Sequence, residues 1–203
     1  MMEGRRNVNG QQRIRDMVLL AFLSAVMLVL QFWGSSIRIG ATNLSLVLIP
    51  IVVGALLLGI KGGLFLGGLF GVTTLLFGGI LAMDLFTATL LQQHPLLITL
   101  ICLLKGIAAG VLPALIHLVF SRRMPFLSVV LASASAPIAN TGIFMLGMTT
   151  VLGTLGSLVG DVVYFLFFTI LVCNFLVEFA ANVIAGPAIH RILLAVGKRT
   201  GRH

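Results

Sequence analysis

The chain has 203 residues, of which 59% are hydrophobic and only 9% charged, and its mean hydropathy is +1.17. A soluble domain needs more charge than this to cover a hydrated surface, whereas a multi-pass membrane protein needs charge only in its loops and ends. The composition therefore excludes an ordinary soluble domain and predicts an all-α integral membrane protein.

The formal net charge of +8 would suit a nucleic-acid-binding protein, but the basic residues do not form one face of a soluble domain. Most of them precede the first apolar run or follow the last one: Arg5, Arg6, Arg13, Arg15, Arg191, Lys198, Arg199 and Arg202. We therefore predict one transmembrane domain over residues 1–203, with basic cytoplasmic tails at 1–15 and 191–203 and no nucleic-acid partner.

Six apolar runs follow one another along the chain. A helix needs about 20 apolar residues to cross a hydrocarbon core of about 30 Å, and polar or Pro/Gly breaks separate runs near that length. In chain order they cover residues 17–33, 43–60, 62–81, 95–120, 126–151 and 160–189. The sequence predicts a compact bundle of six transmembrane helices. The first run is too long for a signal-peptide core and lacks a small-x-small cleavage site, so we expect it to remain as a helix.

The loop charges predict the orientation, because positively charged loops are retained in the cytoplasm. With the N-terminus inside, both basic ends, Lys61 and Arg122–Arg123 lie on the cytoplasmic side, and only Arg38 lies in an outer loop. Two basic ends on one side require an even number of crossings. The expected topology is therefore N-in/C-in, with the longer polar loops 34–42 and 82–94 outside.

Glycines recur at every fourth position in two of the runs: Gly63, Gly67 and Gly71, and then Gly106 and Gly110. This spacing predicts close helix packing, because glycine lets two backbones approach. The alternative is that glycine is simply common in membrane helices.

Lys105 lies about ten residues into the run 95–120, which places its backbone roughly 15 Å deep. A central Lys costs at least about 2.5–3.5 kcal/mol, so we expect it to face the bundle interior and meet a partner. The partner is either an anionic group of a ligand or Glu178 in a structural ion pair. Asn140 and Thr141 lie at a similar depth and are candidates for ligand contacts or for interhelical hydrogen bonds.

Asn174, Glu178 and Asn182 share one face of the last run, because they are four residues apart. This polar face could line a ligand cavity or carry a proton. We favour a structural role, in which it holds the last helix to its neighbours.

Cys102 and Cys173 lie inside apolar runs, and the four histidines are scattered, so neither a disulfide nor a metal site is predicted. The sequence contains no phosphate-binding loop, no nucleophile elbow and no pair of spaced carboxylates on one helix. We therefore expect neither an enzyme nor a cofactor.

Several stretches resemble the substrate-binding S component of an energy-coupling factor transporter. The first run contains an Ala21-x-x-x-Ala25 step, and Pro50, Gly54, Gly59 and Lys61–Gly62–Gly63 stand where the family places similar residues around a helical hairpin. Ile60 departs from the proline that is frequent at this turn. The stretches HPLLITLICLLKGIAAG, NTGIFMLGM and NFLVEFAANVIAGP are similar to the family's last three helices, so the resemblance extends from about residue 13 to residue 191.

The resemblance implies that the chain sits in a prokaryotic cell membrane and binds a water-soluble vitamin or a precursor. It also implies a transmembrane coupling subunit and two ATPase subunits as partners, with Ala21 and Ala25 facing the coupling subunit. The implied ligand site lies on the outer side and contains Arg38, Gln92, Gln93, Lys105 and Asn140. A basic residue there favours an anion such as pantothenate or folate, and riboflavin or a cobalamin precursor is an alternative.

Two further classes of function stay open on the sequence alone. The chain could be a small membrane enzyme, such as a lipid-modifying transferase or an intramembrane hydrolase, or a structural subunit without a ligand. The enzyme would need a clustered acidic or nucleophilic motif, and in the structural subunit Lys105 would be only an ion-pair residue.

Overall fold

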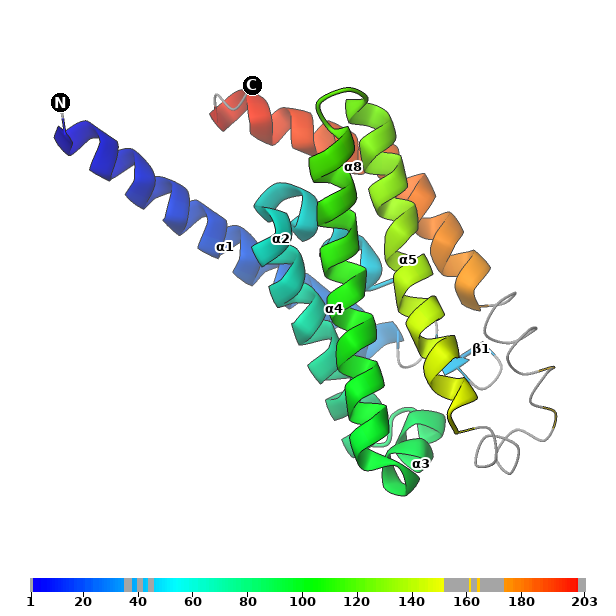
Figure 1. The fold of residues 1–203 in the computed structure, drawn as a ribbon. Coiled ribbons are helices and arrows are strands. Elements are labelled where there is room, and N and C mark those ends of the chain that lie inside the picture. The colour runs from blue at the N-terminus through cyan, green and yellow to red at the C-terminus, as the bar shows by residue number, and fades with distance from the viewer. Residues whose placement is uncertain are drawn as a thin grey trace.

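The computed structural model describes residues 2–34, 38–39, 42–43, 46–151, 161, 164 and 174–200, most of which are helical (Figure 1). The elements in chain order are α1 (Met2–Gly34), β1 (Arg38–Ile39), β2 (Thr42–Asn43), α2 (Leu48–Thr73), the π-helical η1 (Thr74–Ile80), α3 (Leu85–Gln93), α4 (Pro95–Phe120), α5 (Pro125–Thr149) and α8 (Leu176–Thr200).

Five helical segments among the described residues are long and apolar enough to cross a membrane. They are Gly10–Gly34, Leu48–Ile80, Pro95–Phe120, Pro125–Thr149 and Leu176–Ala195. Helices satisfy their own backbone hydrogen bonds, which lipid cannot do for them. The prediction of an all-α, multi-pass membrane protein is therefore confirmed by the length and composition of these helices.

The chain reverses direction within α2, at Gly59. This residue has φ 71° and ψ −160°, a conformation that L side chains rarely adopt. A Cβ atom built on Gly54 would lie 2.1 Å from the Leu66 Cδ1 atom, whereas a straight helix would separate these residues by about 18 Å. Residues 48–58 and 60–73 therefore form a helical hairpin, whose second arm continues into η1.

One predicted helix start is wrong. The helix expected from residue 43 begins at Leu48, because Thr42–Asn43 pairs with Arg38–Ile39 as a short antiparallel ribbon. The basic ends predicted as cytoplasmic tails are helical where the structure describes them, since α1 begins at Met2 and α8 continues to Thr200, and no proline interrupts either extension. The first part of the run 160–189 lies mostly outside the described residues.

The regularly spaced glycines form the contact between α2 and α4. A Cβ atom built on Gly63 would lie 2.2 Å from the Gly110 carbonyl oxygen, and one on Gly67 would lie 2.3 Å from that of Gly106. One on Gly71 would lie 2.7 Å from the carbonyl oxygen of Cys102. No side chain larger than hydrogen fits at such distances, so the two helices touch backbone to backbone. The prediction of close packing at these glycines is confirmed.

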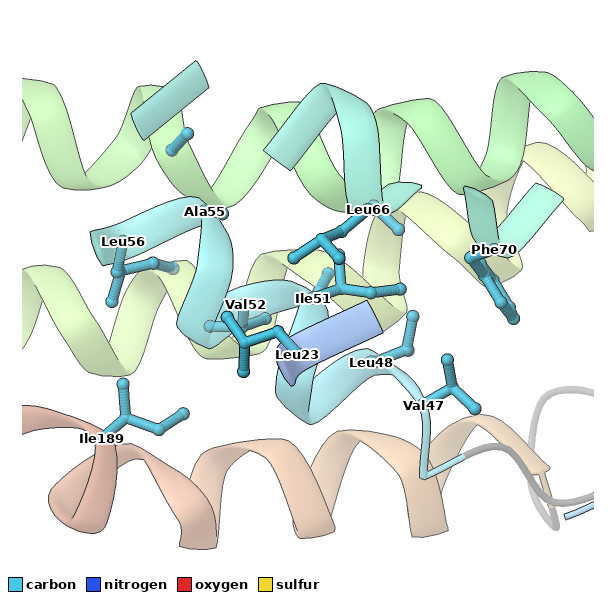
Figure 2. Packing of buried hydrophobic residues seen from close by; sticks show 14 of the residues in the cluster. Leu23, Val47, Leu48, Ile51, Val52, Ala55, Leu56, Leu66, Phe70 and Ile189 are labelled. Atoms are coloured by element: carbon cyan, nitrogen blue, oxygen red, sulfur yellow. The ribbon is translucent and has the colours of Figure 1, made fainter. Parts of the chain in front are cut away.

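Buried apolar side chains form two clusters. The first joins α1, α2, α4, α5 and α8, and Figure 2 shows Leu23, Ile51, Leu66 and Ile189 from four different segments converging on it. The second lies at the end of the bundle where α3 packs against η1 and α4, and it contains Phe86, Leu90, Ile98, Ile101, Cys102, Met148 and Val151. The loop 82–94 thus folds into α3, which covers this end.

Substitution of Gly67 tests the α2–α4 contact. We expect Gly67→Ala to destabilise the protein by about 1–3 kcal/mol, because the added methyl group must displace the α4 backbone. The matched control is Gly68→Ala, since a Cβ atom at Gly68 meets nothing within 4 Å. Thermal unfolding in detergent measures both, and equal effects of the two substitutions would contradict the contact.

Candidate functional site

Lys105 carries its charge into the helical bundle between two aromatic rings. The Lys105 Nζ atom lies 5.0 Å from the ring centroid of Phe144 on α5 and 5.7 Å from that of Phe70 on α2. Lys105 forms no ion pair with any residue that the structure describes. The two ring faces stabilise the ammonium group by about 0.5–2 kcal/mol each, depending on its desolvation.

Two contacts define the register between the antiparallel helices α4 and α5. Near one end the His117 Nδ1 atom lies 3.1 Å from the Ser128 Oγ atom. Toward the other end, a Cβ atom built on Gly147 would lie 2.4 Å from the Ile101 Cδ1 atom. Between these points, Lys105 is level with residues 140–144, in agreement with its contact to Phe144.

A similar pair of contacts relates α5 to α8. The rings of Phe126 and His190 meet edge to face, with centroids 5.5 Å apart. A Cβ atom built on Gly186 would lie 3.7 Å from the Ser133 Oγ atom. Because α8 runs antiparallel to α5, Glu178 is level with residues 138–141. The structure thus brings Lys105, Asn140 and Glu178 to one level of the bundle, from three different helices.

Asn140 and Thr141 are buried at this level, each with 7% of its surface exposed. The Asn140 Oδ1 atom has no hydrogen-bond partner among the described residues. Leaving a buried acceptor unsatisfied costs about 1–3 kcal/mol. A ligand with a hydrogen-bond donor would remove this cost, so the amide of Asn140 is suited to contact a polar ligand.

The polar face of α8 is also buried. Glu178 is 2% exposed and Asn182 is fully buried, and the Asn182 Nδ2 atom donates a hydrogen bond of 2.9 Å to the Glu178 carbonyl oxygen. Asn174 is half-buried at the start of the described segment. A bond within one helix does not distinguish a structural role from ligand binding, and the structural role stays a prediction.

Gln92 and Gln93, two further residues of the expected ligand site, do not lie beside Lys105. Gln92 and Gln93 are exposed at the end of α3, roughly 15 Å along α4 from Lys105. The backbone of Arg38 pairs with Asn43 in the short ribbon, and its side chain lies outside the described part of the chain.

Sequence reasoning missed two side chains at this level and one buried serine about two turns away along α5. Phe70 and Phe144 contact Lys105, but nothing in an apolar run distinguishes them from residues that face lipid. Ser133 is fully buried and its Oγ atom has no hydrogen-bond partner among the described residues. The sequence feature that could have identified Ser133 is the presence of a serine within an apolar run.

Ala21 and Ala25 lie on the exposed face of α1. The opposite face carries Leu23 and Met27, which are 6% and 0% exposed and belong to the first apolar cluster. The membrane-spanning part of α1 is the least buried of the five, and the helix diverges from the bundle toward its N-terminus (Figure 1). Ala21 and Ala25 are therefore accessible to another helix or to lipid.

A comparison with models of known protein families finds no match, and a comparison with curated proteins finds no relative. Within the described ranges, no group of three or more His, Cys, Asp or Glu side chains is placed to hold a metal ion. What the geometry defines is a multi-pass membrane protein with a cationic side chain and an unsatisfied amide inside its helical bundle.

Alanine substitutions in α5 separate a ligand-facing residue from a structural one. Ser128 is fully buried, donates to the Pro125 carbonyl oxygen at 2.7 Å and contacts His117. We expect Ser128→Ala to lower the free energy of unfolding by about 1–3 kcal/mol, because it leaves buried groups unpaired. Without ligand, Asn140→Ala should change the free energy of unfolding by less than about 1 kcal/mol, because no hydrogen bond to the Asn140 Oδ1 atom is lost. Equal losses in thermal unfolding would indicate that Asn140 is structural.

Proposed function

We propose that the chain is the substrate-binding S component of an energy-coupling factor transporter and binds a water-soluble vitamin or precursor for import. The observation that carries the proposal is the Lys105 ammonium group, held between Phe70 and Phe144 without a carboxylate from any described residue. The resemblance of the helix sequences to this family supplies the substrate class.

The surroundings of Lys105 favour an anionic ligand. A charge near the bilayer centre costs at least about 2.5–3.5 kcal/mol, and two aromatic faces offset only part of that. A ligand carboxylate would complete the compensation, and the Asn140 Oδ1 atom at the same level would accept a bond from a ligand amide or hydroxyl. Pantothenate- or folate-like molecules combine these groups.

The proposed topology has six crossings, with both termini in the cytoplasm of a prokaryotic cell. The reversal at Gly59 supports it, because the chain turns back within the apolar segment Leu48–Ile80, and the six crossings then include the short arm 48–58, which is about 16 Å long. Figure 1 supports it as well, since both termini lie at the end of the bundle that holds the α4–α5 turn with Arg122 and Arg123. Positive residues at one end indicate the cytoplasmic side.

The proposed partners are a transmembrane coupling subunit and two ATPase subunits. The sequence has no phosphate-binding loop of its own, so the energy would come from these partners. The exposed Ala21 and Ala25 on α1 support a docking role, because small side chains let a partner helix approach closely.

Thermal unfolding with a panel of vitamins tests the ligand. A ligand at 100 times its Kd should add about 2.7 kcal/mol to the free energy of unfolding. Lys105→Gln should weaken binding of the anionic vitamin at least about tenfold, as expected for one charge-assisted contact of about 1.5–3 kcal/mol. The exposed Lys61→Gln is the matched control and should bind normally. No response to any vitamin, or unchanged affinity in Lys105→Gln, would contradict the proposal.

Bulky substitutions on α1 test the docking face. We expect the double variant Ala21→Trp and Ala25→Trp to abolish vitamin uptake in cells while the purified protein still binds the vitamin, because the indole rings would hold a partner helix away. Phe22→Trp serves as control, since Phe22 is already large and 63% exposed. Normal uptake by the double variant would exclude this interface.

A further inference from the structure

We propose that Arg122, Arg123 and Arg191 form a binding site for the phosphate group of an anionic phospholipid. The site lies at the end of the bundle where the turn between α4 and α5 meets α8. It requires only that the chain is a membrane protein, and it does not depend on the proposed transport function.

A side-chain contact places the two segments that carry the three arginines next to each other. Arg122 and Arg123 lie in the short turn between Phe120, the last residue of α4, and Pro125, the first of α5. Three residues after Arg123, the ring of Phe126 packs edge to face against His190, with centroids 5.5 Å apart. Arg191 is the next residue of α8, so the three exposed arginines lie within four residues of this contact along the chain.

Hydrogen bonds hold the turn in place beneath the arginines. The Ser128 hydroxyl donates its proton to the Pro125 carbonyl oxygen at 2.7 Å, so at 3.1 Å it can only accept from the His117 Nδ1–H group. The fully buried Ser128 thus ties α4 to the first turn of α5. The backbone segment that carries Arg122 and Arg123 is therefore anchored to the bundle through its Pro125 end.

The segments that carry this cluster, and its partners among the described residues, provide no compensating carboxylate. Residues 106–134 and 179–203 contain no Asp or Glu. None of the three arginines forms an ion pair with a residue that the structure describes, in contrast to Arg15, which pairs with Asp16 at 3.1 Å. Three guanidinium groups without a carboxylate attract an anion, and their planar donors suit the oxygens of a phosphate.

The surroundings favour a lipid over a soluble anion. Large apolar side chains next to the arginines are exposed: Val119 by 67%, Phe120 by 43%, Met124 by 53%, Phe126 by 51% and Ile192 by 44%. Such neighbours place the guanidinium groups at the boundary between hydrocarbon and headgroups. The molecule that fits therefore carries an anionic phosphate on an apolar body, as phosphatidylglycerol does.

The experiment compares the protein in nanodiscs of phosphatidylcholine with and without phosphatidylglycerol. We expect phosphatidylglycerol to raise the thermal stability of the wild type and native mass spectrometry to detect it bound. In the triple variant Arg122→Gln, Arg123→Gln, Arg191→Gln, binding should weaken on the order of 100-fold, because each basic residue near an anionic surface contributes about a factor of five. The control Arg13→Gln, an exposed arginine of α1, should weaken binding by no more than about fivefold, the contribution of a single basic residue near an anionic surface.

Equal binding of phosphatidylglycerol by the triple variant and the wild type would overturn the site. Stabilisation of the wild type by inorganic phosphate in pure phosphatidylcholine nanodiscs would overturn its assignment to a lipid. If the triple variant does not fold, the same question is tested on the wild type in high salt. High salt should remove the stabilisation by phosphatidylglycerol, because ions screen exposed charges. Stabilisation that persists in high salt would refute the proposal.

Discussion

The backbone contact between α2 and α4 determines where the chemistry of this protein lies. Gly71 and Gly106 belong to this contact, and each is preceded by a residue of the candidate site, Phe70 and Lys105. Because the helices touch at their glycines, the Phe70 ring comes within 5.7 Å of the Lys105 Nζ atom. A larger side chain at the glycines would separate the helices, and the charge would lose one of its two aromatic neighbours. The close packing of α2 against α4 is therefore also what places Phe70 next to Lys105.

The interior of the bundle contains polar groups whose burial is unfavourable and is not fully compensated by the residues that the structure describes. The ammonium group of Lys105 has ring faces but no described counter-ion, and the Asn140 Oδ1 atom has no described donor. Unsatisfied groups of this kind are unfavourable in a ligand-free protein and favourable once a complementary molecule binds. Ser128, whose bonds to Pro125 and His117 are complete, shows the opposite pattern at the other end of α5. This difference separates the candidate site from the polar contacts that only hold helices together.

The two ends of the bundle differ in character. At one end α3 covers the second apolar cluster, and the N-terminus of α3 is capped by the Asp84 side chain, which accepts a hydrogen bond from the Phe86 amide. At the other end the turn with Arg122 and Arg123 carries exposed charge beside exposed apolar rings. One end is thus closed by packed side chains, and the other has the amphipathic character of a membrane–water boundary.

The sequence by itself determined the class of protein and several helices, because lipid accepts only apolar segments with satisfied backbones. The run 95–120 matches α4 at both ends, and the glycine spacing correctly predicted where helices touch. Only the tertiary structure decided that Phe70 and Phe144 enclose Lys105 and that Gln92 lies apart from it. The reason is that neighbours across helices depend on rotation and register, and an apolar run that can face either lipid or protein encodes neither.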